Sequence, residues 1–196
     1  MPTTTRFAKN MDRGLGIFFA SALFVVAFIF PAHSATFTPC STITWRYDQT
    51  KVPQGRYGLA QDAQGAFDRI TDITGLRFIR TDKPDADITI QWGDLGIKTR
   101  LGGRADTKSG VITINRDTTW ATDKHAGFRL VGGYLPGRGW LLAHEISHIL
   151  GVSHTDVPKQ IMNPKMGTDY WGAEDLAALH YLYPKSKACN TSTATN

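Results

Sequence analysis

The segment 144–154, which reads HEISHILGVSH, constrains this chain more than any other stretch. His144 and His148 are four residues apart, so on a helix they lie one turn apart on one face and can reach a single ion. His154 follows six residues later, and in a continued helix it would be rotated by about 240° and displaced by about 9 Å. The helix must therefore end first, and Gly151 stands where glycine can adopt the left-handed, helix-ending conformation. The segment predicts three imidazoles gathered around one site.

Three neutral imidazoles with an open fourth position are typical of a catalytic zinc site rather than a structural one. Zinc lowers the pKa of a bound water toward about 7. Glu145 follows the first ligand, so it could take a proton as that zinc-bound water attacks a carbonyl and then pass it to the leaving amine. The alternative is a helix with surface histidines and a C-terminal glycine that binds nothing.

The pattern of His144, Glu145, His148, Gly151 and His154 resembles the zinc motif of the metzincin metallopeptidases, and most closely the matrixin-like group. Those peptidases also have a methionine turn beneath the metal, and residues 161–164, which include Met162, resemble it. Taken alone, Met162 could equally be a core side chain. The resemblance implies an α+β fold: a small twisted mixed β-sheet, the active-site helix with a second helix above it, and a small C-terminal subdomain with the methionine turn and a terminal helix.

The order of elements expected from hydrophobic periodicity resembles the matrixin upper subdomain. We expect strands over Ile43–Tyr47, Leu76–Arg80, Ile88–Trp92 and Val111–Ile114, an edge segment over Leu101–Ala105, a loop over Gly127–Gly139, and helices over Leu59–Ile73, Trp140–Leu150 and Ala173–Tyr183. On the last helix we expect an inner face of Leu176, Leu179 and Tyr183. Glu174 and Asp175 suit the positive N-terminal end of that helix dipole.

The resemblance also predicts how an extended peptide or protein substrate would bind. In the family the edge strand pairs with the substrate, a form of strand addition. This assigns substrate contacts to Gly102, Gly103, Arg104 and Ala105, whereas the alternative is a glycine loop that binds nothing. Met166 stands where several family members have a tyrosine in the wall of the main specificity pocket. Tyr170 is near but displaced, so the pocket shape and an oxyanion-binding role for Tyr170 stay open.

The N-terminal segment, residues 1–35, resembles a secretion signal. An apolar run from Leu15 to Phe30 follows a basic stretch and is followed by small residues suited to cleavage after Ser34 or Ala35. The competing interpretation is an uncleaved membrane anchor, which would also place the domain outside. We therefore expect a signal over 1–35, a matrixin-like domain over 36–185 and a polar tail over 186–196, in a secreted, extracellular protein or one anchored outside the membrane.

The two cysteines, Cys40 and Cys189, lie near the two ends of the expected domain. In an exported protein they favour a disulfide that joins those ends. Two free thiols are the alternative. A latency switch, in which Cys40 would block the zinc, is disfavoured because residues 38–41 do not resemble the cysteine segment of matrixin propeptides. We also expect no propeptide.

Composition limits the remaining classes. The 196 residues, 41% hydrophobic and 20% charged, suit one globular domain, and we expect a monomer. The net charge of +5 includes no dense basic run, so we expect no nucleic-acid partner. Many matrixins hold a structural zinc and calcium ions in upper loops, and the resemblance makes Asp123 and His125 candidates for such ligands. The expected cluster of histidines is missing, so structural Ca²⁺ stays open and a second zinc is not expected. Two functions remain: an exported zinc endopeptidase, or an exported binding module with the same fold and no turnover. Glu145 favours the enzyme, because a structural zinc has no use for a general base.

Overall fold

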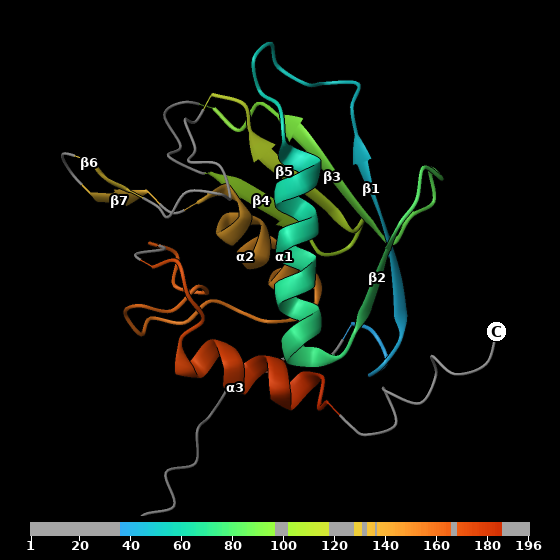
Figure 1. Cartoon of the computed structure of the whole chain (residues 1–196). Coiled ribbons are helices and arrows are strands. Elements are labelled where there is room, and N and C mark those ends of the chain that lie inside the picture. Colours follow the sequence, from blue (N-terminus) through green and yellow to red (C-terminus); the bar gives the residue numbers. More distant parts are fainter. Residues whose placement is uncertain are drawn as a thin grey trace, which may run out of the picture.

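The computed structural model describes residues 36–96, 102–117, 128–130, 133–135, 137–165 and 168–185 (Figure 1). Its strands are β1 (Thr42–Asp48), β2 (Arg77–Arg80), β3 (Ile88–Gly93), β4 (Gly103–Asp106), β5 (Val111–Asn115), β6 (Phe128–Leu130) and β7 (Gly133–Leu135). Its helices are α1 (Leu59–Thr74), α2 (Arg138–Ile149) and α3 (Ala173–Leu182). The expected α+β architecture is confirmed.

Five strands form one mixed sheet in the order β2-β1-β3-β5-β4. The pairs β1–β2, β1–β3 and β3–β5 are parallel, whereas β4 pairs antiparallel with β5. Within this sheet β4 is an edge strand, which agrees with the edge segment expected around Leu101–Ala105. Figure 1 shows α2 next to β4, so the edge of the sheet lies beside the helix that carries the histidine motif.

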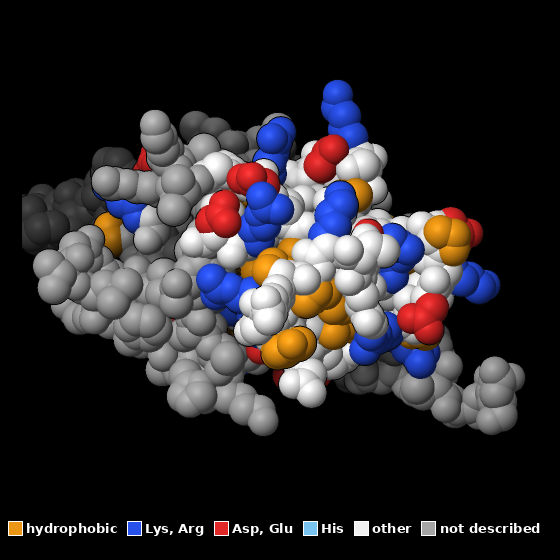
Figure 2. Space-filling view, turned by 90° about the horizontal axis from the view of Figure 1, so that it is seen from above, with side chains coloured by type: hydrophobic (Ala, Val, Ile, Leu, Met, Phe, Trp, Pro, Cys, Tyr) orange, Lys and Arg blue, Asp and Glu red, His pale blue; other side chains and the backbone are white. Residues whose placement is uncertain are grey.

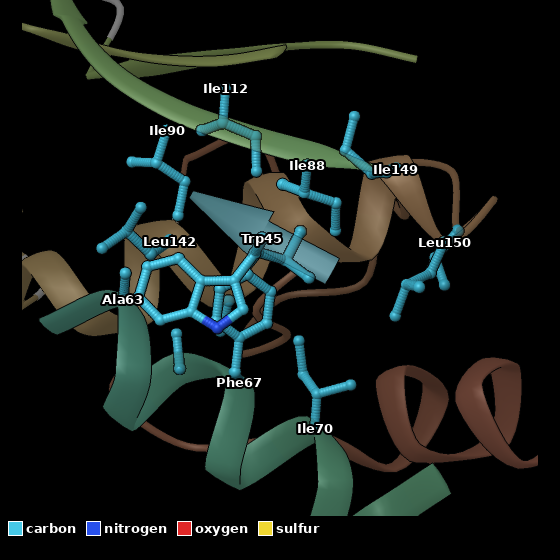
Figure 3. Packing of buried hydrophobic residues seen from close by; sticks show 14 of the residues in the cluster. Trp45, Ala63, Phe67, Ile70, Ile88, Ile90, Ile112, Leu142, Ile149 and Leu150 are labelled. Carbon is cyan, nitrogen blue, oxygen red and sulfur yellow. The ribbon is translucent and has the colours of Figure 1, made fainter. Parts of the chain in front are cut away.

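The core lies between the sheet and the helices that cover one of its faces. Along β3 the buried side chains of Ile88, Ile90 and Trp92 alternate with half-buried Thr89 and Gln91, as expected for a strand covered on one side. Figure 3 shows these isoleucines packed with Trp45, with Phe67 of α1 and with Leu142 of α2. The core therefore fixes α2 against the sheet.

Helix α1 ends as the sequence indicates. Gly75 has φ of 71°, and its N–H donates to the Thr71 carbonyl at 2.8 Å. Glycine accepts this left-handed conformation without the steric cost of a Cβ. The buried pair of Arg138, at the start of α2, and Asp62 of α1 ties the two helices together, and Arg138 also donates to the Tyr57 carbonyl at 2.9 Å.

The expected inner face of α3 is confirmed in part. Leu179 and Tyr183 are buried as expected, whereas Leu176 is half-buried. Asp175, Ala178 and Leu182 are buried as well. Asp175 is buried because its carboxylate accepts three backbone hydrogen bonds there. An apolar stripe predicted from periodicity does not include such a buried polar residue.

Tyr183, directly after α3, joins three parts of the chain. Its hydroxyl donates to the Leu150 carbonyl at 2.8 Å and accepts the N–H groups of Thr36 at 3.1 Å and Phe37 at 3.3 Å. Tyr183 is fully buried, so its hydroxyl requires such partners. The first described residues are thereby held at the end of α2.

The prediction of a loop over Gly127–Gly139 is wrong in part. Strands β6 and β7 pair antiparallel inside it, and α2 begins at Arg138, two residues before the expected start. Strands of three residues are too short for an alternating pattern to stand out among glycines.

The face seen from above in Figure 2 has basic and acidic side chains interspersed, with apolar side chains between them. Arg116 and Asp94 form an exposed ion pair at 3.0 Å, at a hollow of about 520 Å³ where β3 ends.

Among the helices of the described ranges, none is long and apolar enough to cross a bilayer. The run from Leu15 to Phe30 lies outside those ranges, so the signal and the anchor both stay predictions.

Candidate metal centre

The histidine motif begins on α2 and continues beyond its end. The Gly151 N–H donates to the His148 carbonyl at 3.0 Å, and the Val152 N–H donates to the Ser147 carbonyl at 2.9 Å. This pair of bonds is the Schellman motif, in which glycine occupies the left-handed position. Gly151 has φ of 96°, and the predicted helix stop is confirmed.

The turn brings the three imidazoles together at their Nε2 atoms. The Nε2–Nε2 distances are 3.1 Å between His144 and His148, 3.2 Å between His144 and His154, and 3.0 Å between His148 and His154. His144 is buried, His148 is half-buried and His154 is exposed. The site is thus anchored in the core and opens toward solvent.

In His144 and His148, a hydrogen bond at Nδ1 determines which ring nitrogen carries the proton. His144 Nδ1 lies 2.6 Å from the Ile161 carbonyl oxygen, and His148 Nδ1 lies 2.8 Å from the Val152 carbonyl oxygen. A carbonyl only accepts, so each Nδ1 must carry the proton, and each neutral ring then presents an Nε2 lone pair. Two lone pairs at 3.1 Å cannot form a hydrogen bond with each other. The arrangement is explained by a cation between them.

The donor set fits zinc. A tetrahedral ion with bonds of 2.0–2.1 Å holds its nitrogen ligands about 3.4 Å apart, close to the distances found here. Burial, first among its causes, lowers the pKa of His144 to about 3, and burial also lowers the pKa of His148 and of His154. All three rings are therefore neutral at pH 7, as metal ligands must be.

Glu145 follows His144 on α2 and is 5% exposed. Burial raises the pKa of its carboxyl to about 7, and the Ala105 N–H, which donates to the carboxylate, opposes this shift. A buried carboxyl group therefore directly follows the first candidate ligand, His144, on α2.

The methionine segment lies under the triad and is held by a residue whose importance sequence reasoning missed. Asp175 accepts hydrogen bonds from the N–H groups of Ile161 at 2.6 Å, Met162 at 3.0 Å and Gly172 at 2.9 Å. The Ile161 carbonyl is in turn the partner of His144 Nδ1. Asp175 thus acts on a metal ligand through one peptide unit. The sequence signal was an acidic residue that a helix N-terminus explains equally well.

A hollow of about 490 Å³ opens beside the metal position. Its walls come from the first described residue, the turn after β4, the end of α2 and the loop after α2. They consist of Thr36, Thr107, His148, Gly151, Val152, Ser153 and His154. Two candidate ligands therefore face a space large enough for part of a peptide.

The expected substrate-binding residues are brought to the site only in part. Gly103 and Ala105, on β4, lie next to Glu145, and Arg104 is exposed. Gly102, just before β4, accepts a ladder hydrogen bond from Asn115. Tyr170 is 55% exposed, and its N–H lies near the Thr168 hydroxyl oxygen at 3.3 Å.

Several expected residues lie outside the described ranges. Met166, Cys189, Asp123 and His125 are among them, so the pocket wall, the disulfide with Cys40 and a structural Ca²⁺ stay predictions.

The sequence matches the matrixin family, peptidase family M10, over residues 36–183. This chain belongs to the matrixin family. The match covers the sheet, α2 with its histidines, the methionine segment and α3. The resemblance inferred from the motif is confirmed, and the family implies zinc as the metal of the triad.

Three matrixin relatives have detectable sequence similarity. Macrophage metalloelastase of Rattus norvegicus is 31% identical over 138 residues, 61% of this chain and 28% of the relative. Metalloendoproteinase 2-MMP of Arabidopsis thaliana is 27% identical over 143 residues, which cover 66% of this chain and 38% of the relative. Macrophage metalloelastase of Oryctolagus cuniculus is 30% identical over 153 residues, which cover 72% of this chain and 32% of the relative. The similarity spans about a third of each relative's length.

Proposed function

We propose that this matrixin is a zinc-dependent endopeptidase that hydrolyses peptide bonds with Glu145 as the general base. The observation that carries the proposal is the convergence of three neutral Nε2 atoms within 3.2 Å of one another. The adjacent carboxylate of Glu145 supplies a group that a structural metal site would not need. The names of the relatives, metalloelastase and metalloendoproteinase, agree with this activity.

The ligands and the base have separate tasks. His144, His148 and His154 would hold zinc, which, when bound, polarises a carbonyl and lowers the pKa of water. The carbonyls of Ile161 and Val152 keep two of the rings oriented. A Glu145 carboxylate oxygen would take the proton of the attacking water, and the resulting carboxyl would give it to the leaving amine nitrogen.

We further propose that an extended peptide binds along β4. This edge strand lies beside Glu145, and the hollow next to His148 and His154 leaves room for peptide residues. Strand addition would use backbone groups of β4 that do not pair with β5. Of the expected residues Gly102 to Ala105, the backbone groups of Gly103 and the carbonyl of Ala105 would provide these contacts, and the exposed side chain of Arg104 could contact the substrate.

The decisive experiment is Glu145→Gln, with zinc content and hydrolysis of a mixed peptide library measured together. Glutamine keeps the size of the side chain and cannot accept the proton. We expect full zinc content and a loss of hydrolysis of about 10²–10⁴-fold or more. A matched control, Lys83→Ala in the exposed turn between β2 and β3, should leave the rate unchanged.

Two results would contradict the proposal. Near-wild-type hydrolysis by zinc-loaded Glu145→Gln would exclude this carboxylate as the base. Zinc bound by the wild type without hydrolysis of any peptide in the library would favour a binding module that kept the fold and the metal.

We also propose that the protein is exported and that Cys40 pairs with Cys189. N-terminal sequencing should find a mature chain that starts near Ala35 or Thr36, whereas an intact Met1 on a membrane-bound form would support the anchor. The loop between the cysteines is long, for which chain entropy predicts about 4–5 kcal/mol of stabilisation as an upper figure. Thiol titration of the denatured, unreduced protein should find no free thiol; two would exclude the pairing.

A further inference from the structure

The backbone of β4 and the carboxylate of Glu145 are in close contact. A Cβ added at Gly103 would lie 2.8 Å from Glu145 Oε1, 3.1 Å from its Cγ and 3.2 Å from its Cδ. These distances are shorter than ordinary van der Waals contacts of 3.5–4.0 Å. The carboxylate therefore occupies space that any side chain at position 103 would need.

The ladder between β4 and β5 explains which backbone groups face Glu145. The Asn115 N–H donates to the Gly102 carbonyl at 2.8 Å, so these two residues form a hydrogen-bonded pair. Such pairs alternate along an antiparallel ladder, so the N–H groups of Gly103 and Ala105 point away from β5. The Ala105 N–H donates to the Glu145 carboxylate instead.

We propose that β4 positions the catalytic base: the missing side chain of Gly103 leaves the slot in which the Glu145 carboxylate lies, and the Ala105 N–H holds it there. This inference rests on the proposed function, because it assigns Gly103 a task in the reaction through Glu145. Gly103 is then a positioning residue, in addition to any contact with substrate.

The reason for a slot is the length of the glutamate side chain. Glutamate has three rotatable bonds, whereas general-base catalysis needs the acceptor oxygen within hydrogen-bond reach of the proton that it takes. Burial at 5% exposure restricts the side chain, and one N–H donor then selects the carboxylate position. The edge strand thereby completes the site from the side opposite α2.

The contact predicts an unusual signature for Gly103→Ala. Gly103 does not have a left-handed φ, so alanine suits its backbone, and the atoms that the new methyl group meets belong to a flexible side chain. The carboxylate should move rather than the strand. A displacement of about 1 Å near the reacting atoms can cost about 10²-fold in rate. We expect kcat to fall about 10- to 100-fold, with unchanged zinc content and an unchanged urea midpoint, while Lys83→Ala, in the exposed turn between β2 and β3, retains the wild-type kcat.

A double-mutant cycle separates positioning from substrate binding. If Gly103 acts through Glu145, then Gly103→Ala should cause no further loss of kcat in a Glu145→Gln background. An equal fold loss of kcat in both backgrounds would overturn the proposal. So would a change confined to KM, since Gly103 would then act only on the peptide.

The contact can also be measured without turnover. In the metal-free protein, Glu145→Ala and Gly103→Ala should each shift the ¹⁵N–¹H signal of the Ala105 amide and speed its hydrogen exchange. The Arg104 amide, which lies on the β5 side of the ladder, is the internal control. An unmoved Ala105 signal in both variants would overturn the contact.

The two proposals fail in different ways. Hydrolysis that persists in Glu145→Gln, or that is absent from the wild type, would contradict the proposed function and this inference with it. Loss of activity in Glu145→Gln together with wild-type kcat in Gly103→Ala would overturn this inference alone.

Discussion

Asp175→Asn is predicted to weaken both the fold and the metal centre. Asp175 is 1% exposed and accepts three backbone N–H groups, two of them in the methionine segment. An asparagine has one carbonyl oxygen, and its NH₂ group would face at least one N–H that the carboxylate accepted. The replacement thus exchanges hydrogen bonds with a charged acceptor for hydrogen bonds with a neutral one. It also leaves at least one of the three buried backbone N–H groups without an acceptor.

The size of the effect follows from those hydrogen bonds. Hydrogen bonds to a charged group contribute about 1.5–3 kcal/mol each, neutral ones about 1, and an unpaired buried donor costs about 1–3 kcal/mol. Burial raises the pKa of Asp175, so removing the charge also recovers part of a desolvation cost. We expect the free energy of unfolding to fall by about 2–4 kcal/mol, or about 5–15 °C in Tm for a domain of this size.

The metal should respond as well, because Asp175 accepts the Met162 N–H of the peptide unit whose Ile161 carbonyl contacts His144. Loss of such an outer partner typically weakens metal affinity about 10- to 100-fold. Urea unfolding of the metal-free protein and zinc competition against a chelator measure the two effects. Asp72→Asn, an exposed carboxylate on α1, is the control. Unfolding within about 0.5 kcal/mol of wild type, together with unchanged zinc affinity, would refute the reasoning, since that range is typical of neutral surface changes.

Three further predictions concern the frame of the site. Gly151→Ala forces an L side chain to φ of 96°, and should cost about 1–2 kcal/mol in thermal unfolding and weaken zinc binding; an unchanged Tm would contradict the strain. Arg138→Met removes the guanidinium that pairs with the buried Asp62 carboxylate and should cost about 3–5 kcal/mol in urea unfolding. Asp62→Leu in the same chain should restore most of this loss, and a double variant as unstable as the single one would contradict the prediction. Folding lowers the pKa of His144 from 6.5 to about 3, so between these pH values the unfolded chain binds a proton at His144 and the folded chain does not. The metal-free protein should therefore lose stability as pH falls from about 6.5 toward 3. In urea unfolding, a His144→Gln variant should lose part of this pH dependence.

The sequence predicted the metal centre well because its geometry is local. The spacing of His144 and His148 fixes them on one helix face, and Gly151 supplies the stop that His154 requires. Three distances of 3.0–3.2 Å between Nε2 atoms confirm that convergence.

Features that depend on distant partners were not predictable in this way. Asp175 looked like a residue that favours a helix N-terminus, but its partners, Ile161 and Met162, lie 14 and 13 residues earlier. The contact between Gly103 and Glu145 joins a strand and a helix far apart in the chain, and periodicity contains no information about it. The pairing of β6 with β7 was missed because each strand has three residues.

The hydroxyl of Tyr183 has a consequence for engineering. It accepts the backbone N–H of Thr36, the first described residue, at 3.1 Å, so the first described residues lie beside the residue that follows α3. Domains with adjacent ends tolerate insertion into a surface loop of a host protein and circular permutation. A graft of this kind would have to keep Tyr183, because the same oxygen donates to Leu150, the residue before the glycine turn that leads to His154. In such a graft, a pulling force on the host segments joined to either end would act on the Tyr183 hydroxyl, and through Leu150 on the turn that positions His154. The zinc affinity of the graft would then report mechanical strain.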